Sequence, residues 1–545
     1  MAANFRALGL IMTVASSFHA PGLFRRNAVL LILPVLFALM LAVMLRSSLP
    51  FWQVFNLDPD YYYLLNGLRL VEYLPPTDLG HPGTPIQMFI AVVLRLMHAG
   101  EPTGAIVEAV LDDPERHLLV ATLLIYPLVA LALFALGRAF LTATGRLAPA
   151  LLAQSAPFLS MIIPKFSLHP KPEPFLIIAA CLLVAVALWV VRAGRLEDRH
   201  AGWLGLVLGF GIACKMQFLA LGLVPLFILD RRRLFLVLPL ATIAGFLIFV
   251  APAIPSRDIF FDWWGRVLLH SGAYGTGQAT IVDTARYPRA ILGLFGSKIL
   301  FTVVFLLSLF ALGGYVRLRR RGLIAADRLA GLLAGMVAAQ LFTVLLIAKQ
   351  AAAHYMLPAL MLTGPSLAVL WCLSAKVFPA RGHRRAWIGI GAVLALITVP
   401  AAWKQNAELA RWTRDAQGFD MGRFKACAKI DFDSVSSLPY ALQRGDMNAQ
   451  GRYSPKIALR MPQDHYTWFI NRHAFWDEGF MQFNIPKDLA QVVASYPCAV
   501  FRGTQPWRAK SWAADRIPGF HMDDSCEAGE ETIFTTGIKC DGTAP

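Results

Sequence analysis

Residues 27–45 read NAVLLILPVLFALMLAVML, an unbroken apolar stretch. At a rise of about 1.5 Å per residue, a helix of this length almost crosses the ~30 Å hydrocarbon core of a bilayer. Arg25 and Arg26 precede the stretch, and no small-residue cleavage site follows it. We therefore expect an uncleaved first membrane span whose N-terminal end lies in the cytoplasm.

The composition of the whole chain also indicates a membrane protein. Hydrophobic residues make up 57% of the 545 positions and charged residues 15%, and the mean hydropathy is +0.55. A water-soluble surface needs more polar residues, so we predict a polytopic protein of the lipid bilayer. The net charge of +16 does not indicate a nucleic-acid partner. Its arginines gather in short clusters between apolar stretches, a pattern typical of topology signals.

Further apolar segments bring the prediction to about eleven transmembrane helices. Residues 203–229 count as two short helices that meet near Lys215, because one continuous helix would export the arginines at 231–233. Residues 85–98 form a helix of only about 21 Å, which we expect to lie on the outer membrane face. The spans after the first are 118–136, 147–163, 174–191, the two helices of 203–229, 234–253, 291–315, 329–348, 355–374 and 387–403.

The predicted fold class is therefore mainly α, with a small second domain. Residues 1–403 form the transmembrane module, and residues 46–116 form its first external loop. Residues 404–545 have a soluble composition and short strand-like runs, which predicts an α+β domain. An odd number of spans places this domain outside the cytoplasm.

The cysteines of the tail agree with that placement. Four of them in an oxidising compartment predict two disulfides with three candidate pairings, the alternative being reduced thiols in a cytoplasmic tail. Trp468 and Trp476 are expected to be core residues rather than a stacking surface for sugar rings. The four cysteines are Cys427, Cys498, Cys526 and Cys540.

Ionisable side chains from several distant segments gather on the outer face under this topology. Such groups at a membrane edge are costly unless they are paired or hydrated, so they predict an outward-facing cavity. A carboxylate there suits a general base, and cations suit a bound phosphate. The candidates are Asp58, Asp60, Glu72, His81, Lys165, His169, Lys171, Glu173, Lys215, Arg257, Asp262, His270, Lys349 and His354.

The first external loop carries a resemblance to a known family. Its residues 56–87, NLDPDYYYLLNGLRLVEYLPPTDLGHPGTPIQ, contain an acidic pair followed by Tyr62, and a proline-rich turn that begins at His81. This pattern resembles the GT-C superfamily of polyprenyl-phosphate-sugar-dependent glycosyltransferases, in particular its protein-mannosyltransferase-like and lipid A sugar-transferase-like branch. The likeness covers residues 25–375.

Two later elements and two departures complete the comparison. A glycine-rich element that ends at Lys215 and a His354-Tyr355-x-x-Pro element resemble family motifs. The family's adjacent acidic residues are split here by Pro59, so the choice of base stays open between Asp58, our first choice, and Asp60. In the segment KFSLHPKPEP, Glu173 stands where the family usually has an aspartate.

The resemblance implies a hexosyl- or pentosyltransferase in a bacterial inner membrane, with a periplasmic C-terminal domain. Asp58, or Asp60, would take the proton of an acceptor hydroxyl, which attacks the anomeric carbon and releases polyprenyl phosphate with inversion. The acceptor is expected to be an envelope glycan, lipid or protein. No metal site is named, although a divalent cation stays an open alternative. The implied substrate- and phosphate-binding residues are His81, Lys165, His169, Lys171, Glu173, Lys215, His354 and Tyr355.

Two other functional classes remain as alternatives. Broken helices and charges within the membrane also occur in transporters and lipid flippases. That class is disfavoured because the two halves of the chain show no repeat, and because the titratable groups gather on one face. A non-catalytic subunit of an envelope-assembly complex is the third interpretation.

Overall fold

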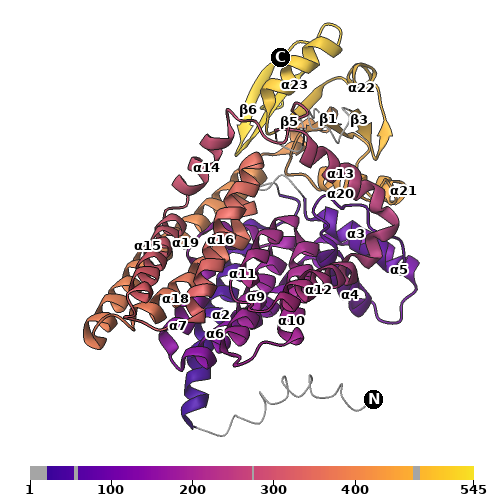
Figure 1. Cartoon of the computed structure of the whole chain (residues 1–545). Coiled ribbons are helices and arrows are strands. Elements are labelled where there is room, and N and C mark those ends of the chain that lie inside the picture. Colours follow the sequence, from indigo (N-terminus) through magenta and orange to yellow (C-terminus); the bar gives the residue numbers. More distant parts are fainter. Residues whose placement is uncertain (1–20, 54–58, 273–274, 276, 470–478) are drawn as a thin grey trace.

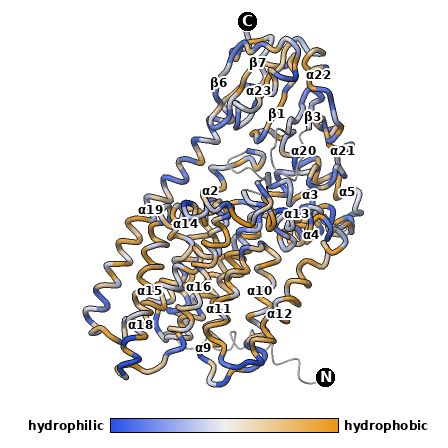
Figure 2. Tube along the Cα trace, turned by 45° about the horizontal axis from the view of Figure 1, so that its top comes forward, coloured by the Kyte–Doolittle hydropathy of each residue, from blue (hydrophilic) through white to orange (hydrophobic). Residues whose placement is uncertain are grey.

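The computed structural model describes residues 21–53, 59–272, 275, 277–469 and 479–545 (Figure 1). In this part of the chain, eight helical segments are long and apolar enough to cross a membrane, which confirms a multi-pass membrane protein. Figure 2 shows them as a mainly hydrophobic bundle below a more hydrophilic domain. The segments are Arg25–Ser48, Pro114–Thr144, Pro172–Arg192, Arg232–Leu269, Ile299–Arg320, Arg328–Gln350, Ala353–Ser374 and Ala380–Phe424.

The helix ends follow from local sequence. In α6, the Asp113 side chain accepts a hydrogen bond from the backbone N–H of Arg116 at the start, and Gly145 closes the end in a left-handed conformation (φ 70°). Such caps satisfy backbone groups that have no partner inside the helix. The long helices are α2 (Pro21–Ser48), α6 (Pro114–Thr144), α9 (Pro172–Arg192), α10 (Asp198–Cys214), α12 (Arg232–Val250), α15 (Ile299–Arg320), α16 (Arg328–Ile347), α18 (Thr363–Ser374) and α19 (Ala380–Gly418).

Two predicted spans are built differently from the expectation. The segment 147–163 is broken into α7 (Leu147–Gln154), a 3₁₀ turn and α8 (Ile162–Phe166), because its prolines cannot continue a regular helix. The segment 291–315 begins in α14 (Tyr287–Gly296) and continues in α15 after a break. The count of eleven spans therefore stays a prediction.

Two unusual predictions are confirmed by the helix boundaries. The expected short helix is α4 (Thr84–Met97), and its location on the outer membrane face stays a prediction. The expected break near Lys215 separates α10 from a 3₁₀ helix at Met216–Gly222, which leads into α11 (Leu223–Leu226). Lys215 itself has extended backbone angles (φ −158°, ψ 133°). Lys215 is therefore the residue at which the helical backbone is interrupted.

Glycines bring α10 close to α12. A Cβ on Gly205 would lie 2.5 Å from the carbonyl oxygen of Leu238. A Cβ on Gly209 would collide with the backbone of Thr242 and Phe246. Small residues four positions apart allow such close backbone approach in membranes.

We expect Gly209→Ala to destabilise the protein by about 1–3 kcal/mol, because the added methyl group must push α12 away. Thermal unfolding in detergent measures this change. Gly202→Ala is the matched control on the same helix, since a Cβ there meets no atom within 4 Å. Equal unfolding midpoints for the two variants would contradict the close packing.

The tail forms a mixed α/β domain. Its described residues contain a seven-stranded sheet in the order β4-β3-β2-β1-β5-β7-β6, with β1 parallel to β2 and β5. Trp468 is 1% exposed in the core of this domain, as expected, and Trp476 lies outside the described residues. The strands are β1 (Ala428–Phe432), β2 (His465–Phe469), β3 (Gly479–Gln482), β4 (Ile485–Pro486), β5 (Ala499–Gly503), β6 (Asp524–Ala528) and β7 (Glu531–Thr536). The helices are α20 (Leu438–Asn448), α21 (Ser454–Ala458), α22 (Leu489–Ser495) and α23 (Pro506–Arg516).

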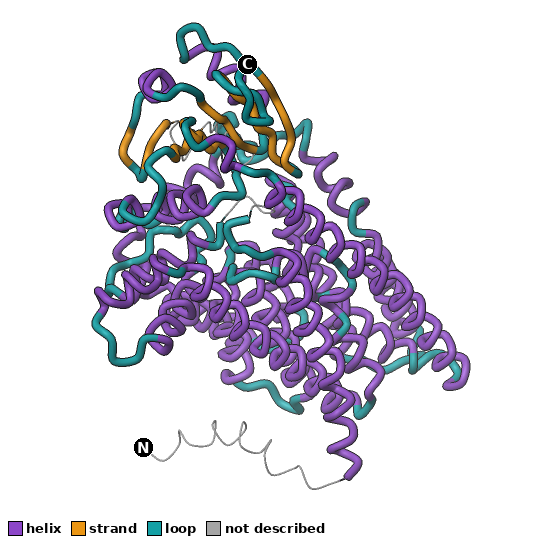
Figure 3. The backbone as a smooth tube through the Cα atoms, turned by 180° about the vertical axis from the view of Figure 1, so that it is seen from behind, coloured by secondary structure: helices purple, strands orange, loops and turns teal. Residues whose placement is uncertain are grey.

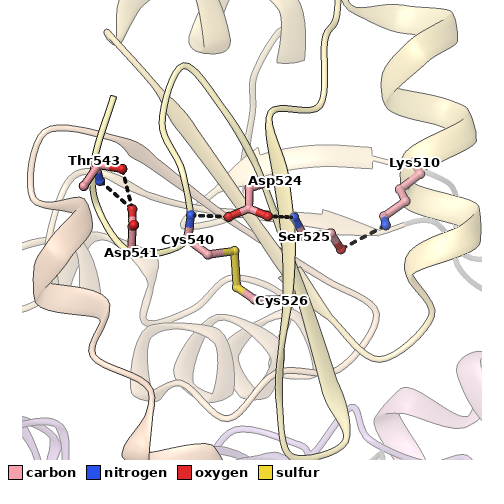
Figure 4. The surroundings of a disulfide bond; sticks show 7 residues. All are labelled: Lys510, Asp524, Ser525, Cys526, Cys540, Asp541 and Thr543. Atoms are coloured by element: carbon pink, nitrogen blue, oxygen red, sulfur yellow. Dashed lines mark hydrogen bonds between the residues drawn. A yellow bond between two sulfur atoms is a disulfide. The ribbon is translucent and has the colours of Figure 1, made fainter. Parts of the chain in front are cut away.

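The four tail cysteines form two disulfides, Cys427–Cys498 and Cys526–Cys540. The first joins the residues that precede β1 and β5. Beside the second, the carboxylate of Asp524 accepts a hydrogen bond from the backbone N–H of Cys540 at 2.9 Å (Figure 4). Of the three candidate pairings, the structure selects the one that holds neighbouring segments of the sheet together.

The C-terminal domain caps one end of the helical bundle (Figure 3). The helix α3 (Tyr61–Val71) of the first external loop packs against α20. Arg69 donates to the carbonyl of Ala449 at 2.9 Å, and Thr77 donates to that of Asn448 at 2.6 Å. The helix α19 connects the bundle to the C-terminal domain and runs unbroken through the predicted domain boundary at 403/404.

Candidate functional site

Asp60 lies at the centre of a buried ionic group. It precedes the first turn of α3 and is 2% exposed. One carboxylate oxygen accepts a hydrogen bond from Nδ1 of His169, and the other lies 3.6 Å from Nζ of Lys171. Both partners are also buried. A carboxylate so enclosed must be paired to be stable, and two different residues of one loop pair it here.

A second buried pair lies where the helices end. Nζ of Lys215 donates to the carboxylate of Glu173 at 2.5 Å, and each of the two residues is 3% exposed. Glu173 stands in the first turn of α9, and Lys215 occupies the break after α10. The Lys215 ammonium also lies 5.2 Å from the centroid of the Tyr355 ring, within the range of a cation–π contact.

Two histidines join the second pair to the first. The ring centroid of Tyr355 lies 4.2 Å from that of His354 and 6.2 Å from that of His81. Burial lowers the pKa of His81 well below its ordinary value, and the charges of Lys215, His354 and Lys171 lower it further. Because Lys171 also faces Asp60, the two ionic groups form one continuous site.

We expect the stability of the protein to fall as the pH drops below about 6.5, in part because of His81. The folded state holds this imidazole neutral, whereas the unfolded chain takes up a proton near that pH. Above this pH both states are neutral and the residue contributes no pH dependence. Unfolding midpoints from pH 8 to 5 should therefore fall less for His81→Asn than for the wild type. Parallel curves would contradict the lowered pKa.

Some predicted site residues lie elsewhere. Lys165 does not join Asp60; its ammonium lies 4.7 Å from the ring centroid of Trp412 on α19. Glu72 binds Arg452 of the C-terminal domain at 2.9 Å. Asp58, the first choice as base, falls outside the described residues.

Two supporting residues, Ser48 and Glu115, were not predicted from the sequence. Oγ of Ser48 lies 3.3 Å from Nε2 of His169 and so fixes the far side of the imidazole. The carboxylate of Glu115 accepts hydrogen bonds from the Tyr61 hydroxyl at 2.6 Å and from the Phe51 backbone at 2.8 Å. Glu115 could have been predicted as a site residue from the sequence, because it is an ionisable residue at the outer end of a predicted span. Ser48 carries no such signal.

The C-terminal domain covers one side of the site. The guanidinium of Arg444, on α20, lies 5.7 Å from the ring centroid of Tyr62, and Gly445 packs on Tyr61. These tyrosines directly follow Asp60. The C-terminal domain thus covers the helix that carries the central carboxylate. Among the described residues, no group of three His, Cys, Asp or Glu side chains is arranged to hold a metal ion.

Comparisons with known proteins show a likeness to solved structures only. No protein-family model matches the chain, and no curated protein matches it. Among solved structures, it is similar to the crystal structure of ArnT from Cupriavidus metallidurans bound to undecaprenyl phosphate. The two chains are 12% identical, with a TM-score of 0.44, and the match covers 94% of this chain and 99% of the other.

Proposed function

We propose that this protein is an inverting membrane glycosyltransferase that moves a sugar from a polyprenyl-phosphate donor to an acceptor of the cell envelope. The observation that carries the proposal is the continuous buried site of carboxylates and cations under the C-terminal domain. Buried charges of both signs on separate elements are costly and are typical of functional sites. Sugar transfer from a phosphate needs both kinds: a base for the acceptor and cations for the leaving group.

The cationic side of the site suits the donor phosphate. Lys171 and Lys215 already pair with the carboxylates of Asp60 and Glu173, so a bound phosphate adds negative charge that these pairs do not offset. A nearby anion raises the pKa of an imidazole. We therefore assign His81 to take up a proton from solvent when the donor phosphate binds and to donate a hydrogen bond to the departing polyprenyl phosphate as its second charge develops. Lys171 and Lys215 then contribute positive charge close to the phosphate.

The carboxylates suit the acceptor. The acceptor oxygen bonds to the anomeric carbon while the bond from that carbon to the phosphate oxygen breaks, and the hydroxyl proton passes to a carboxylate. His169 and Lys171 already engage both oxygens of Asp60. We therefore assign Asp60 a positioning role and keep Asp58 as the base, with Asp60 as the alternative.

Purified full-length protein in liposomes tests the proposal. The liposomes carry a panel of hexosyl and pentosyl polyprenyl phosphates together with an extract of envelope acceptors, and mass spectrometry follows release of polyprenyl phosphate. We expect release from one donor, dependent on acceptor and lost in the Asp58→Asn/Asp60→Asn double variant. Absence of acceptor-dependent release from every donor would reject the enzyme and favour a carrier or an assembly subunit, whereas equal release by the double variant would reject the carboxylate base.

A further inference from the structure

A large apolar groove lies between α15, α18 and α19, away from the proposed catalytic site. Its volume is about 1180 Å³, compared with about 300–1,000 Å³ for typical small-molecule pockets. The walls include Val303, Leu307 and Phe310 of α15, Leu370 of α18, and Ile390 and Leu394 of α19. Its lining is almost entirely apolar, so water is a poor occupant.

The helix α19 leaves this space open because little protein packs against it. Within α19, all of which lies in the described part of the chain, His383 and Leu409 are the buried side chains. Protein interiors and membranes do not leave such volumes empty. A spanning helix that stands off from its neighbours is therefore packed by lipid chains.

The end of the groove far from the C-terminal domain is strongly basic. Lys376 lines it, and the exposed residues Arg381, Arg384 and Arg385 flank it at the start of α19. The first turn of this helix has no acidic residue. Cations at a helix N-terminus are unfavourable, because the helix dipole is positive there, unless an anion lies close by. Asp327, which pairs with Lys376 at 2.5 Å, offsets only one of these charges.

We propose that this groove binds an anionic phospholipid, with its acyl chains along α15 and α19 and its phosphate at the N-terminus of α19. The arginine-rich end is the one predicted to face the cytoplasm, where anionic headgroups meet basic juxtamembrane residues. The groove is separate from the donor site, because the proposed phosphate-binding lysines lie at the capped end of the bundle. The phospholipid is thus a structural partner rather than a substrate.

Native mass spectrometry of the full-length protein tests this with phosphatidylglycerol and phosphatidylcholine of equal chain length. We expect the wild type to retain phosphatidylglycerol more tightly. Arg384→Gln/Arg385→Gln should weaken it roughly thirtyfold, at about fivefold for each arginine. The matched control is Arg231→Gln/Arg232→Gln, which removes the same charge from exposed residues at the start of α12, outside the groove lining.

A groove-filling variant tests the apolar part independently of charge. Gly314 and Gly389 line the groove, and a Cβ on either meets no atom within 4 Å. Gly314→Leu/Gly389→Leu should therefore fold and lose the bound lipid, whereas Gly391→Leu, on the same helix but outside the lining, should keep it. Equal binding of the two lipids, equal loss in either control, retention after filling, or displacement of the phospholipid by polyprenyl phosphate would overturn the proposal.

Discussion

Asp58→Asn is expected to lower kcat for sugar transfer by about 10²–10⁴-fold, the usual contribution of a general base. An asparagine has nearly the shape of aspartate but cannot accept the acceptor proton. The donor KM and the unfolding midpoint should change little, because the proposed role is confined to the chemical step. Steady-state kinetics in liposomes measure both parameters. Glu101→Gln is the control, as it removes an exposed carboxylate of the same external loop.

Comparing Asp60→Asn with Asp58→Asn shows which of the two aspartates is the base. This change leaves Lys171 and His169 without the carboxylate they enclose, so we expect lower stability and a higher donor KM as well as a lower kcat. The opposite pattern would exchange the two roles: a pure kcat effect at Asp60 together with an active Asp58→Asn protein. The kinetic split therefore decides between the two candidates even though both variants lose activity.

Lys215→Met is expected to destabilise the protein by about 3–5 kcal/mol, because it leaves the Glu173 carboxylate buried without its cation. Thermal unfolding in detergent measures the change. Glu173→Gln/Lys215→Met removes both charges and should recover most of the lost stability. The double variant thus separates the cost of an unpaired charge from any role in catalysis.

Activity of the same double variant tests the phosphate assignment. Without the Lys215 ammonium, we expect transfer to fall about 10²–10³-fold even though the fold is restored, since positive charge no longer stabilises the leaving phosphate. Wild-type rates in a stable double variant would show that the pair is structural only. Tyr355→Phe is a mild companion change that keeps the ring beside Lys215 and should retain most activity.

Hydropathy predicted the membrane class and most spans, because the cost of polar groups in lipid acts on composition alone. The arginine clusters located the break near Lys215, because one long helix would export the arginines at 231–233. Hydropathy missed the interruption of 147–163, whose prolines still leave the segment apolar. The domain boundary at 403/404 stays a prediction; α19 continues past it to Gly418, although the residues there have already turned polar. Hydropathy marks the end of the membrane rather than the end of a helix.

The candidate site was predicted in part. The segment KFSLHPKPEP supplied four candidates from its expected outer position, and three of them, His169, Lys171 and Glu173, face the site. Lys165 lies on a helical turn that points its side chain toward Trp412. The cover that the C-terminal domain forms over α3 depends on contacts between residues some 380 positions apart in sequence, such as the hydrogen bond from Arg69 to the carbonyl of Ala449. Such contacts follow from tertiary packing and leave no local pattern.

The most direct test is mass analysis of envelope glycans and lipids from a strain that lacks the gene. The account predicts the loss of one hexose or pentose from a defined acceptor, restored by the wild-type gene and not by the Asp58→Asn/Asp60→Asn variant. An unchanged envelope would contradict the proposed sugar transfer, and full restoration by that variant would contradict the carboxylate base.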